Sequence, residues 1–304
     1  NVNAVRYFKE TMIPVRRDLK LLGGDAPEKT VFASTLNTTS SSDGVTARSS
    51  VVRKMVFSGQ AVSDREPMNE PKVWSYAGSP VRITLRNVSY SYPDGEDPVL
   101  QQLDWQLQPG MIAGLTGASG SGKSTLVDLL MGLLEPIEGE IFVDNMVLQT
   151  WLDTNPGGVG YIPQAIFLAD DSLRRNIALG LPDQEIDDDR VWQCLKDAQL
   201  DTFVKSLPEG LETVTGEDGV RLSGGQRQRI GIARALYHQP GFIVMDEGTS
   251  ALDAQTENDV LEAIDPLRGR CTILIISHRE SGLRICDDQW VLDNQSMTHK
   301  SVTI

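Results

Sequence analysis

The feature that most constrains the fold is residues 117–124, which read Gly-Ala-Ser-Gly-Ser-Gly-Lys-Ser and fit the pattern G-x-x-x-x-G-K-[ST]. An apolar run at 112–116 precedes this segment, and leucines at helical spacing follow it between positions 126 and 133. A strand, a glycine-rich loop and a helix in this order direct backbone N–H groups and the positive end of a helix toward a phosphate. The alternative is a flexible glycine loop that happens to contain a lysine, but both flanks agree with the phosphate-binding motif.

The motif also assigns roles within this loop. We expect Lys123 to reach the β- and γ-phosphates of a nucleotide and the Ser124 hydroxyl to ligate Mg²⁺. The positions expected to contact nucleotide here are Gly117, Ser119, Gly120, Ser121, Gly122, Lys123, Ser124 and Thr125. The loop therefore predicts an ATP site with Mg²⁺ and indicates a P-loop NTPase, without deciding which one.

Short apolar runs alternate with helical patterns along the rest of the chain. Apolar and polar residues alternate over 81–86, which predicts a half-buried strand. Continuous apolar runs at 242–245 and 272–276 are typical of a parallel sheet covered on both faces. Strands that alternate with helices predict an α/β domain.

Two carboxylates, Asp246 and Glu247, directly follow the apolar run at 242–245. The carboxyl ends of buried parallel strands are where α/β sheets bind ligands. We therefore expect Asp246 to hold Mg²⁺, directly or through water, and Glu247 to polarise the attacking water as general base. Taken alone, the pair is equally consistent with a strand that ends in solvated acids. Beside the phosphate loop we favour the catalytic interpretation.

A second glycine motif, residues 222–226, reads Leu-Ser-Gly-Gly-Gln and opens another helical pattern. We expect Ser223 and the amides of Gly224 and Gly225 to cap that helix, and an exposed cap of this kind is a second anion site. One ATP does not need two such sites in one chain, whereas two chains arranged head to tail would use both. The alternative is an ordinary capped surface helix.

With these motifs in this order, residues 81–293 resemble the ATP-binding cassette (ABC) family. The resemblance implies a P-loop NTPase (RecA-like) core with an antiparallel β-subdomain and an α-helical signature subdomain. It also implies a head-to-tail homodimer. In that dimer each ATP lies between the phosphate loop of one chain and the signature residues of the other, here Ser223, Gly224, Gly225 and Gln226.

Three more positions resemble family residues that face the nucleotide. Tyr92, which we choose over Tyr90 because it precedes Pro93, resembles the aromatic that stacks on adenine. Gln164 resembles the glutamine that contacts Mg²⁺ and water, and His278 resembles the switch histidine that contacts the γ-phosphate. In isolation, such residues more often have packing or surface roles. The resemblance implies catalytic roles for Glu247, His278, Lys123 and Gln164, and Mg²⁺ ligation by Ser124, Gln164 and Asp246.

Two positions resemble coupling elements of the family. Asp253 ends the segment Ser-Ala-Leu-Asp, which resembles the loop that carries signals between the two ATP sites. Glu217 lies in a stretch that resembles the loop by which exporter-type cassettes touch a transmembrane domain, although a Gly-rich surface turn is the alternative. Residues 172–180 and 203–210 also resemble exporter-type cassettes. Gly248 stands where the family more often has alanine, and this departure removes no catalytic group.

The chain is expected to divide into residues 1–79, a basic N-terminal segment and linker, and residues 80–304, the cassette. One hypothesis is that 1–79 contains cytoplasmic parts of the membrane domain of a longer protein, and the other is a disordered or tag-like leader. No apolar run approaches the ~18 residues that a membrane span needs. Three widely spaced cysteines without metal-ligand spacing are interpreted as reduced thiols.

Charge and motif content separate the competing functions. With 42 acidic and 28 basic residues the net charge is −14, which argues against a nucleic-acid partner. The resemblance implies an ATPase on the cytoplasmic face of a membrane, the plasma (inner) membrane, that powers export through a transmembrane domain in the same longer chain or in a separate subunit. The alternative, a soluble ABC ATPase acting on nucleic acid or ribosomes, usually carries long coiled-coil insertions or two cassettes. A nucleotide kinase would leave residues 222–226 and His278 unexplained.

Overall fold

The computed structural model describes residues 78–93, 97–216, 220, 222–246 and 254–300. The chain divides into two units, and every described residue belongs to one of them. The expected N-terminal segment lies outside the described residues apart from its last two positions, and so do Glu217, Glu247, Gly248 and Asp253.

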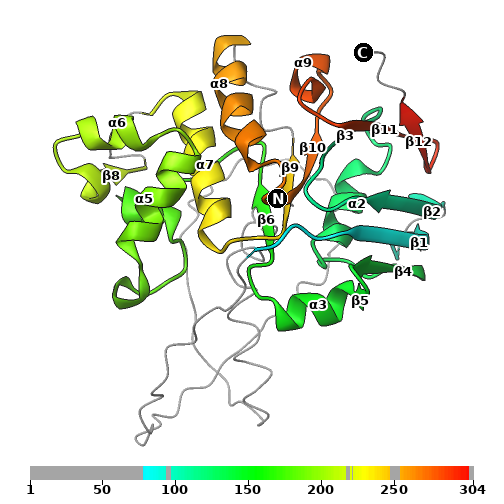
Figure 1. Ribbon diagram of the computed structural model, residues 1–304. Coiled ribbons are helices and arrows are strands. Elements are labelled where there is room, and N and C mark those ends of the chain that lie inside the picture. The colour runs from blue at the N-terminus through cyan, green and yellow to red at the C-terminus, as the bar shows by residue number, and fades with distance from the viewer. Residues whose placement is uncertain (1–77, 94–96, 217–219, 221, 247–253, 301–304) are drawn as a thin grey trace, which may run out of the picture. The chain divides into compact units, whose positions relative to one another are not determined.

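Six strands form the central sheet, in the order β12-β11-β3-β10-β9-β6 (Figure 1). They are β3 (Ile112–Thr116), β6 (Val159–Ile162), β9 (Phe242–Asp246), β10 (Thr272–Ile276), β11 (Asp288–Asp293) and β12 (Ser296–Lys300). The five strands from β11 to β6 are parallel, and β12 pairs antiparallel with β11. The runs at 112–116 and 272–276 are therefore strands as predicted, and β9 extends one residue further, to Asp246.

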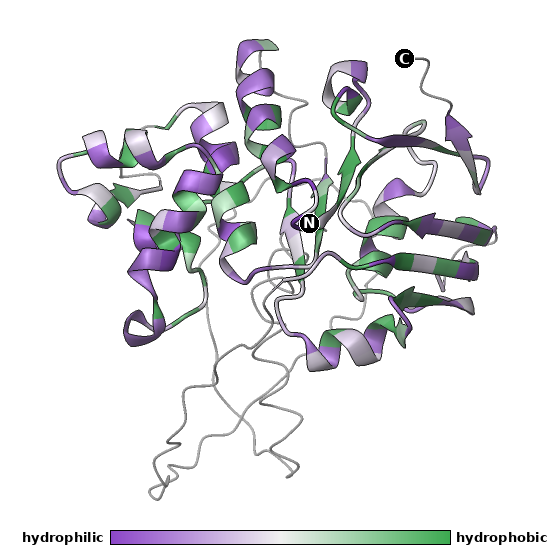
Figure 2. Cartoon of the chain, viewed as in Figure 1, coloured by the Kyte–Doolittle hydropathy of each residue, from purple (hydrophilic) through white to green (hydrophobic). Residues whose placement is uncertain are grey.

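The three central parallel strands, β3, β10 and β9, are buried on both faces, and their alternate residues enter two different hydrophobic cores. One core takes Ile112, Ile243, Met245, Ile273 and Ile275. The other takes Ala113, Leu115, Phe242, Val244, Leu274 and Ile276. Because successive side chains of a strand point to opposite faces, these two cores lie on opposite sides of the sheet. Figure 2 shows the corresponding hydrophobic colouring of β10 at the centre of the fold.

A four-stranded antiparallel sheet covers one side of the fold, in the order β2-β1-β4-β5. Its strands are β1 (Ile83–Tyr90), β2 (Leu100–Leu107), β4 (Glu138–Val143) and β5 (Met146–Val147). The alternation over 81–86 falls on β1 and the two residues before it, where Ile83 and Leu85 are buried. Helices α2 (Lys123–Leu130) and α3 (Leu148–Thr154) contribute to the same core as this sheet.

Helices on the opposite side of the central sheet contribute to the other core, and a small sheet accompanies them. They are α4 (Leu173–Ile177), η1 (Asp183–Glu185), α5 (Asp188–Asp197), α6 (Asp201–Ser206), η2 (Gly210–Glu212) and α7 (Gly224–Tyr237), together with the small sheet β7 (Asp171–Ser172) and β8 (Val214–Thr215). The remaining elements are α8 (Ala254–Ile264), η3 (Asp265–Leu267) and α9 (Glu280–Leu283). The expected α/β core with an antiparallel β-subdomain and an α-helical subdomain is confirmed.

The three cysteines, Cys194, Cys271 and Cys286, are free and buried. Burial raises the pKa of each thiol to about 12, so each stays protonated near neutral pH. Within the described ranges, we find no helix that combines the length and the apolar character that a membrane crossing requires.

We predict that Thr272→Val destabilises the fold, because Thr272 joins the start of the β-subdomain to the central sheet. Its buried hydroxyl donates to the Val81 carbonyl oxygen at 2.6 Å and accepts from the Gly110 N–H at 3.0 Å. The isosteric valine leaves both backbone groups without this partner, at a cost of about 1–3 kcal/mol for each buried group. Chemical denaturation measures the loss. Thr298→Val, on the exposed strand β12, is the matched control and should leave the free energy of unfolding within ~0.5 kcal/mol.

Candidate functional site

Four neighbouring strands of the central sheet end at the candidate residues. The phosphate loop follows β3, His278 follows β10 after one residue, Asp246 ends β9, and Gln164 lies two residues beyond β6. These strands are adjacent in the order β3-β10-β9-β6 and all run parallel. Their carboxyl ends therefore meet at one edge of the sheet, the edge at which open α/β sheets bind ligands.

The phosphate loop has a backbone path that only glycine allows at two of its positions. Gly122 has a φ of 100°, and a Cβ there would lie 2.9 Å from Leu100 Cδ2. A Cβ on Gly117 would lie 2.2 Å from the Leu292 carbonyl oxygen. The path leads directly into α2, whose first-turn N–H groups have no partners within the helix.

Lys123 lies within this loop. Its ammonium donates to the carbonyl oxygens of Gly117 at 2.8 Å and Ala118 at 2.7 Å, and the side chain is 7% exposed. The loop backbone therefore holds a buried positive charge beside the N-terminus of α2. Both features favour an anion at this position.

The loop fits a phosphate group. The Ser121 hydroxyl oxygen is buried and has no hydrogen-bond partner among the described residues, which is a costly arrangement unless a ligand oxygen supplies one. Gly120 has nothing within 4 Å of the place where a Cβ would lie, so the loop is open on that side. Ser119, Gly120 and Ser124 are exposed, which leaves them accessible to a ligand.

Asp246, at the end of β9, fits a Mg²⁺ site in which nucleotide phosphates supply some of the ligands. Tyr161 on β6 donates to an Asp246 carboxylate oxygen at 3.1 Å and so orients that carboxylate. Across the described ranges, we find no group of three or more His, Cys, Asp or Glu residues placed to hold a metal. Mg²⁺ usually binds one or two carboxylates together with substrate phosphates and water, so the donor set Ser124, Gln164 and Asp246 suits it.

The segment around His278 is held by its neighbours in the chain. The Ser277 N–H donates to the Leu115 carbonyl oxygen at 3.1 Å, which ties the segment to β3. The Ser277 hydroxyl accepts from the Arg279 N–H and donates to the Arg279 carbonyl oxygen, both at 3.0 Å. His278 itself is exposed between these two residues. Gln164 is also exposed, next to Pro163, whose carbonyl oxygen accepts from the Gln228 side chain at 3.3 Å.

Tyr90 and Tyr92 occupy different environments, although their rings meet edge to face at 5.2 Å. Tyr90 is 7% exposed, and its burial raises the pKa of the phenol. Tyr92 is 44% exposed, and its hydroxyl shares a 3.1 Å hydrogen bond with the Thr125 hydroxyl. The structure thus places the exposed aromatic, and not the buried one, beside the phosphate-loop helix.

The signature residues begin a different helix. Ser223 is the N-cap of α7: its hydroxyl accepts from the Gln226 N–H at 3.2 Å, and the Gln226 side chain accepts from the Ser223 N–H at 2.9 Å. Ser223 and Gly224 are exposed, whereas Gly225 is buried. The capping predicted for Ser223 is confirmed. The Gln226 side chain takes part in that cap, which the sequence analysis did not anticipate.

Sequence reasoning missed three residues around this edge: Tyr161, Ser277 and Glu257. Tyr161 orients Asp246, Ser277 holds the His278 segment, and Glu257 on α8 accepts a hydrogen bond from Ser281 at 3.0 Å. Tyr161 and Ser277 carry a signal, because each lies within three residues of a candidate position. Glu257 carries none, since only the tertiary structure shows that it is buried.

Comparison with known proteins identifies the family of the chain. The family model described as "ABC transporter" matches residues 100–250. An "ATP-dependent lipid A-core flippase" from Saccharophagus degradans is 35% identical over 252 residues, 83% of this chain and 41% of the relative. A protein of the same description from Alkalilimnicola ehrlichii is 38% identical over 249 residues, 80% of this chain and 42% of the relative. The chain belongs to the ABC transporter family.

A solved structure also resembles this ABC cassette. The "Structure of a bacterial Atm1-family ABC exporter with ATP bound" is 33% identical, with a TM-score of 0.63, and the match covers 72% of this chain and 38% of that one. Over this match, the chain corresponds in sequence and fold to the ATP-binding cassette of that exporter. It spans about two fifths of the length of the bacterial relatives named above. The alternative of a soluble ABC ATPase acting on nucleic acid or ribosomes is not favoured.

We predict that Lys123→Ala weakens ATP binding at least ~10-fold, because it removes a charge-assisted interaction with phosphate. Isothermal titration of the cassette with ATP measures the affinity. Lys196→Ala, on the exposed side of α5, is the control and should bind ATP as the unaltered chain does. Equal affinity in both variants would contradict the role assigned to Lys123.

Proposed function

We propose that this cassette binds and hydrolyses ATP with Mg²⁺ in a head-to-tail dimer, and that the cycle powers export of a substrate across a membrane through an associated transmembrane domain. The observation that carries the proposal is the presence of two helix N-termini with anion-binding chemistry whose helices pack on opposite faces of one sheet. The phosphate loop precedes α2, which packs in the core on the β-subdomain side. The signature precedes α7, which packs in the other core.

This placement supports a dimer. A single ATP at the phosphate loop lies at the helix on one face, so the α7 N-terminus of the same chain faces a different ligand. Two cassettes related by a two-fold axis bring each phosphate loop opposite the partner's signature, and a two-fold interface uses the same surface on both subunits. We assign Ser223, Gly224, Gly225 and Gln226 to the nucleotide of the neighbouring cassette.

Within each site, we assign the steps of hydrolysis to separate side chains. Tyr92 stacks on the adenine, and the loop residues 117–125 bind the phosphates, with Lys123 at the β- and γ-phosphates. Glu247 accepts a proton from the attacking water, and His278 and Gln164 position the γ-phosphate and that water. Ser124, Gln164 and Asp246 would hold Mg²⁺, and the ion would supply positive charge beside the phosphate oxygens.

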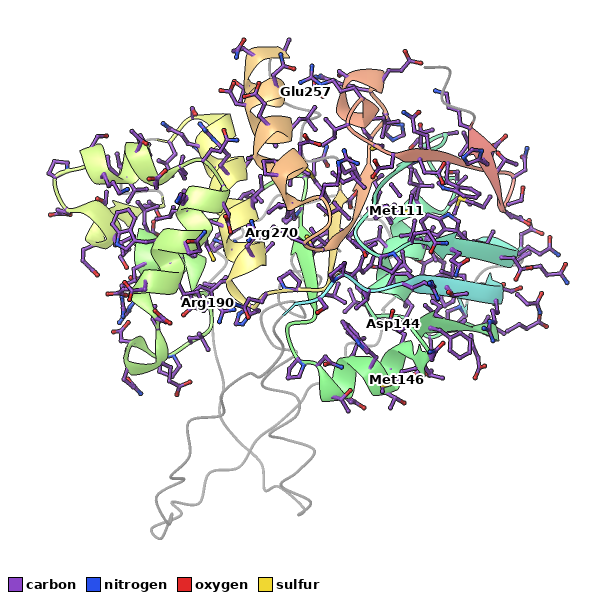
Figure 3. All side chains as sticks on the ribbon, viewed as in Figure 1. Met111, Asp144, Met146, Arg190, Glu257 and Arg270 are labelled. Atoms are coloured by element: carbon purple, nitrogen blue, oxygen red, sulfur yellow. The ribbon has the colours of Figure 1, made fainter. Side chains whose placement is uncertain are left out.

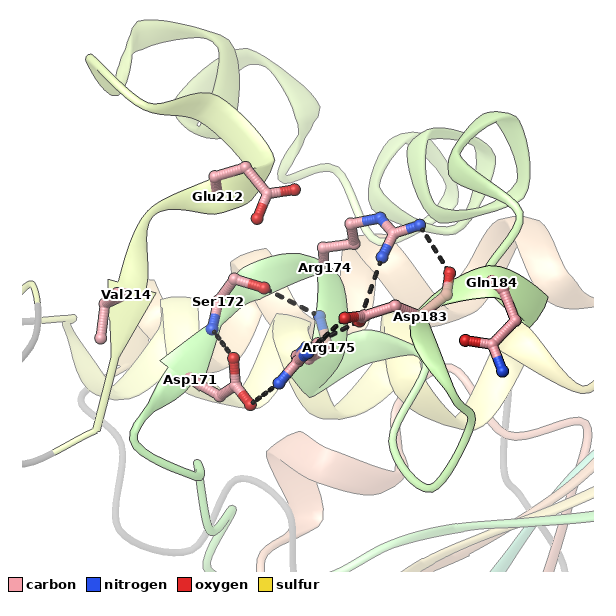
Figure 4. A pocket seen from close by; sticks show the side chains of 8 residues that line it. All are labelled: Asp171, Ser172, Arg174, Arg175, Asp183, Gln184, Glu212 and Val214. Atoms are coloured by element: carbon pink, nitrogen blue, oxygen red, sulfur yellow. Dashed lines mark hydrogen bonds and ion pairs between the residues drawn. The ribbon is translucent and has the colours of Figure 1, made fainter.

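We assign the docking surface for the transmembrane partner to the face around β7 and β8. A pocket of about 700 Å³ opens there between α4, η1 and η2 (Figure 4). Val214 on β8, which lines the pocket, is 45% exposed, and Phe167 on the segment before β7 is 56% exposed. Contiguous apolar patches on the surface of a folded domain mark sites of protein contact, and we assign Val214 and Phe167 to such a patch. We therefore propose that a cytoplasmic segment of the transmembrane domain docks here, with Glu217 of the adjoining loop as a coupling residue.

Ion pairs hold the walls of this pocket in place. Arg175 bonds both Asp183 and Asp171 (Figure 4). Arg174 bonds Asp188 at 2.5 Å. The Arg175 hydrogen bond lowers the pKa of Asp183 below its usual range. The pocket therefore presents fixed charges of both signs around an apolar residue, a surface suited to a polar-rimmed protein contact.

The proposal extends to location and domain organisation. A transmembrane partner places the cassette on the cytoplasmic face of a membrane, which we assign to the plasma (inner) membrane. Residues 80–304 are proposed as the cassette, and residues 1–79 as a basic segment that contributes cytoplasmic parts of the membrane domain. Asp253 is proposed to couple the two ATP sites of the dimer.

We predict that Glu247→Gln keeps ATP binding and slows hydrolysis by about 10²–10⁴-fold, the usual contribution of a general base. ATP should then trap the dimer, because the step that releases it is blocked. A phosphate-release assay measures the rate, and light scattering measures the mass with ATP or, as control, with ADP. Normal hydrolysis would remove Glu247 from its role, and a monomer with bound ATP would contradict the head-to-tail dimer.

We also predict that Val214→Asp lowers the ATPase rate of the full native protein in lipid vesicles several-fold. A charge placed in the docking contact is buried without a partner and weakens it. Val147→Asp is the matched control, since this valine also lies on a two-residue strand and is 38% exposed. Equal rates for the two variants would place the docking surface elsewhere.

A further inference from the structure

We propose that Glu257 is a positioning residue for His278: from the first turn of α8, its buried carboxylate holds the chain segment that follows the histidine. The inference rests on the proposed role of His278 in hydrolysis. It adds a residue outside the nucleotide motifs, recognised only because the fold brings α8 and α9 together. Figure 3 labels Glu257 on α8.

The contact itself is direct. Glu257 is 3% exposed, and one carboxylate oxygen accepts a hydrogen bond from the Ser281 hydroxyl at 3.0 Å. The guanidinium of Arg279 lies 3.9 Å from the same oxygen. Both partners follow His278 within three residues, so one buried side chain gathers the segment just beyond the histidine. A carboxylate in such surroundings is held by these bonds, because leaving it without them is costly.

The other end of the segment is fixed independently. Ser277 donates its N–H to the Leu115 carbonyl oxygen of β3. Its hydroxyl makes two 3.0 Å hydrogen bonds with the backbone of Arg279. His278 therefore lies between an anchor on the central sheet and an anchor on α8. Loss of either anchor leaves the backbone of His278 fixed at one side only, so the imidazole can move. A displacement of about 1 Å at a reacting centre can lower the rate ~10²-fold.

The helix that carries Glu257 is itself well fixed. Thr256, its neighbour in the first turn of α8, lies so close to the signature helix that a Cβ on Gly225 would be 2.4 Å from the Thr256 methyl carbon. The turn thus packs against α7 with one residue and holds the His278 segment with the next. In a head-to-tail dimer the signature and His278 of one chain serve different ATP molecules. Glu257 therefore links the His278 segment, which serves one ATP, to the helix packing around the signature, which serves the other ATP.

The test compares steady-state ATP hydrolysis by variants of the full native protein. We expect Glu257→Ala to lower kcat ~10-fold, equivalent to about 1.4 kcal/mol, while KM for ATP stays within ~2-fold. Glu257→Gln should recover most of kcat, because its amide oxygen still accepts the Ser281 hydrogen bond. Glu262→Gln is the matched control on the exposed side of α8 and should behave as the unaltered protein.

Two further variants separate positioning from general stability. Ser281→Ala removes the same hydrogen bond from an exposed residue, so it should lower kcat as Glu257→Ala does even if the glutamate variant folds poorly. Because Glu257 acts through His278, adding Glu257→Ala to His278→Ala should cause no further fall in kcat. A purely structural residue would instead lower the melting temperature and multiply the effect of His278→Ala.

The outcomes distinguish this inference from the proposed function. If His278→Ala reduces hydrolysis but Ser281→Ala and Glu257→Ala leave kcat unchanged, the positioning role is overturned and the ATPase assignment stands. Multiplicative effects of Glu257→Ala and His278→Ala overturn it equally. If the unaltered protein does not hydrolyse ATP, both the function and the inference fall together.

Discussion

Strand β10 is the element on which the arrangement of the site depends. All five of its residues, Thr272–Ile276, are buried, and it pairs in parallel with β3 on one side and β9 on the other. Because these strands share one direction, the segments that follow them emerge at one edge. The phosphate loop, the His278 segment and Asp246 thereby become neighbours although they are far apart in the sequence. A strand reversed at this place would move one of them to the far end of the sheet.

The same strands also separate the two helix N-termini that we assign to nucleotide binding. Their alternate side chains fill two cores, and each core attaches one anion-binding helix, α2 on the β-subdomain side and α7 on the helical side. A helix N-terminus favours an anion only within its first turn, so α2 and α7 each offer a separate anion-binding position. The proposed dimer follows from this separation, and the Glu257 contact indicates how the two half-sites of one chain share a support.

Local sequence was a good guide wherever the physical cause is local. The loop at 117–124 needs glycine for its backbone path, and the neighbouring apolar runs need burial, so both were predictable from residue type and spacing. The Ser223 cap was predictable for the same reason, since a cap involves residues three positions apart. Three hydrogen bonds were not predicted: the one from the Ser223 N–H to the Gln226 side chain, the one from Tyr161 to Asp246, and the one from Ser281 to Glu257. The last two join residues 85 and 24 positions apart in the chain.

By itself, the sequence determined the α/β class, the phosphate loop, the acidic strand end and the capped signature helix, because each depends on interactions among near neighbours. The resemblance to a known family added Tyr92, Gln164 and His278. Only the tertiary structure decided that Tyr90 is buried while Tyr92 is exposed beside Thr125, and that a glutamate without any motif supports the His278 segment. Burial and long-range hydrogen bonds depend on how strands and helices pack, and that packing is a property of the whole fold rather than of any local stretch.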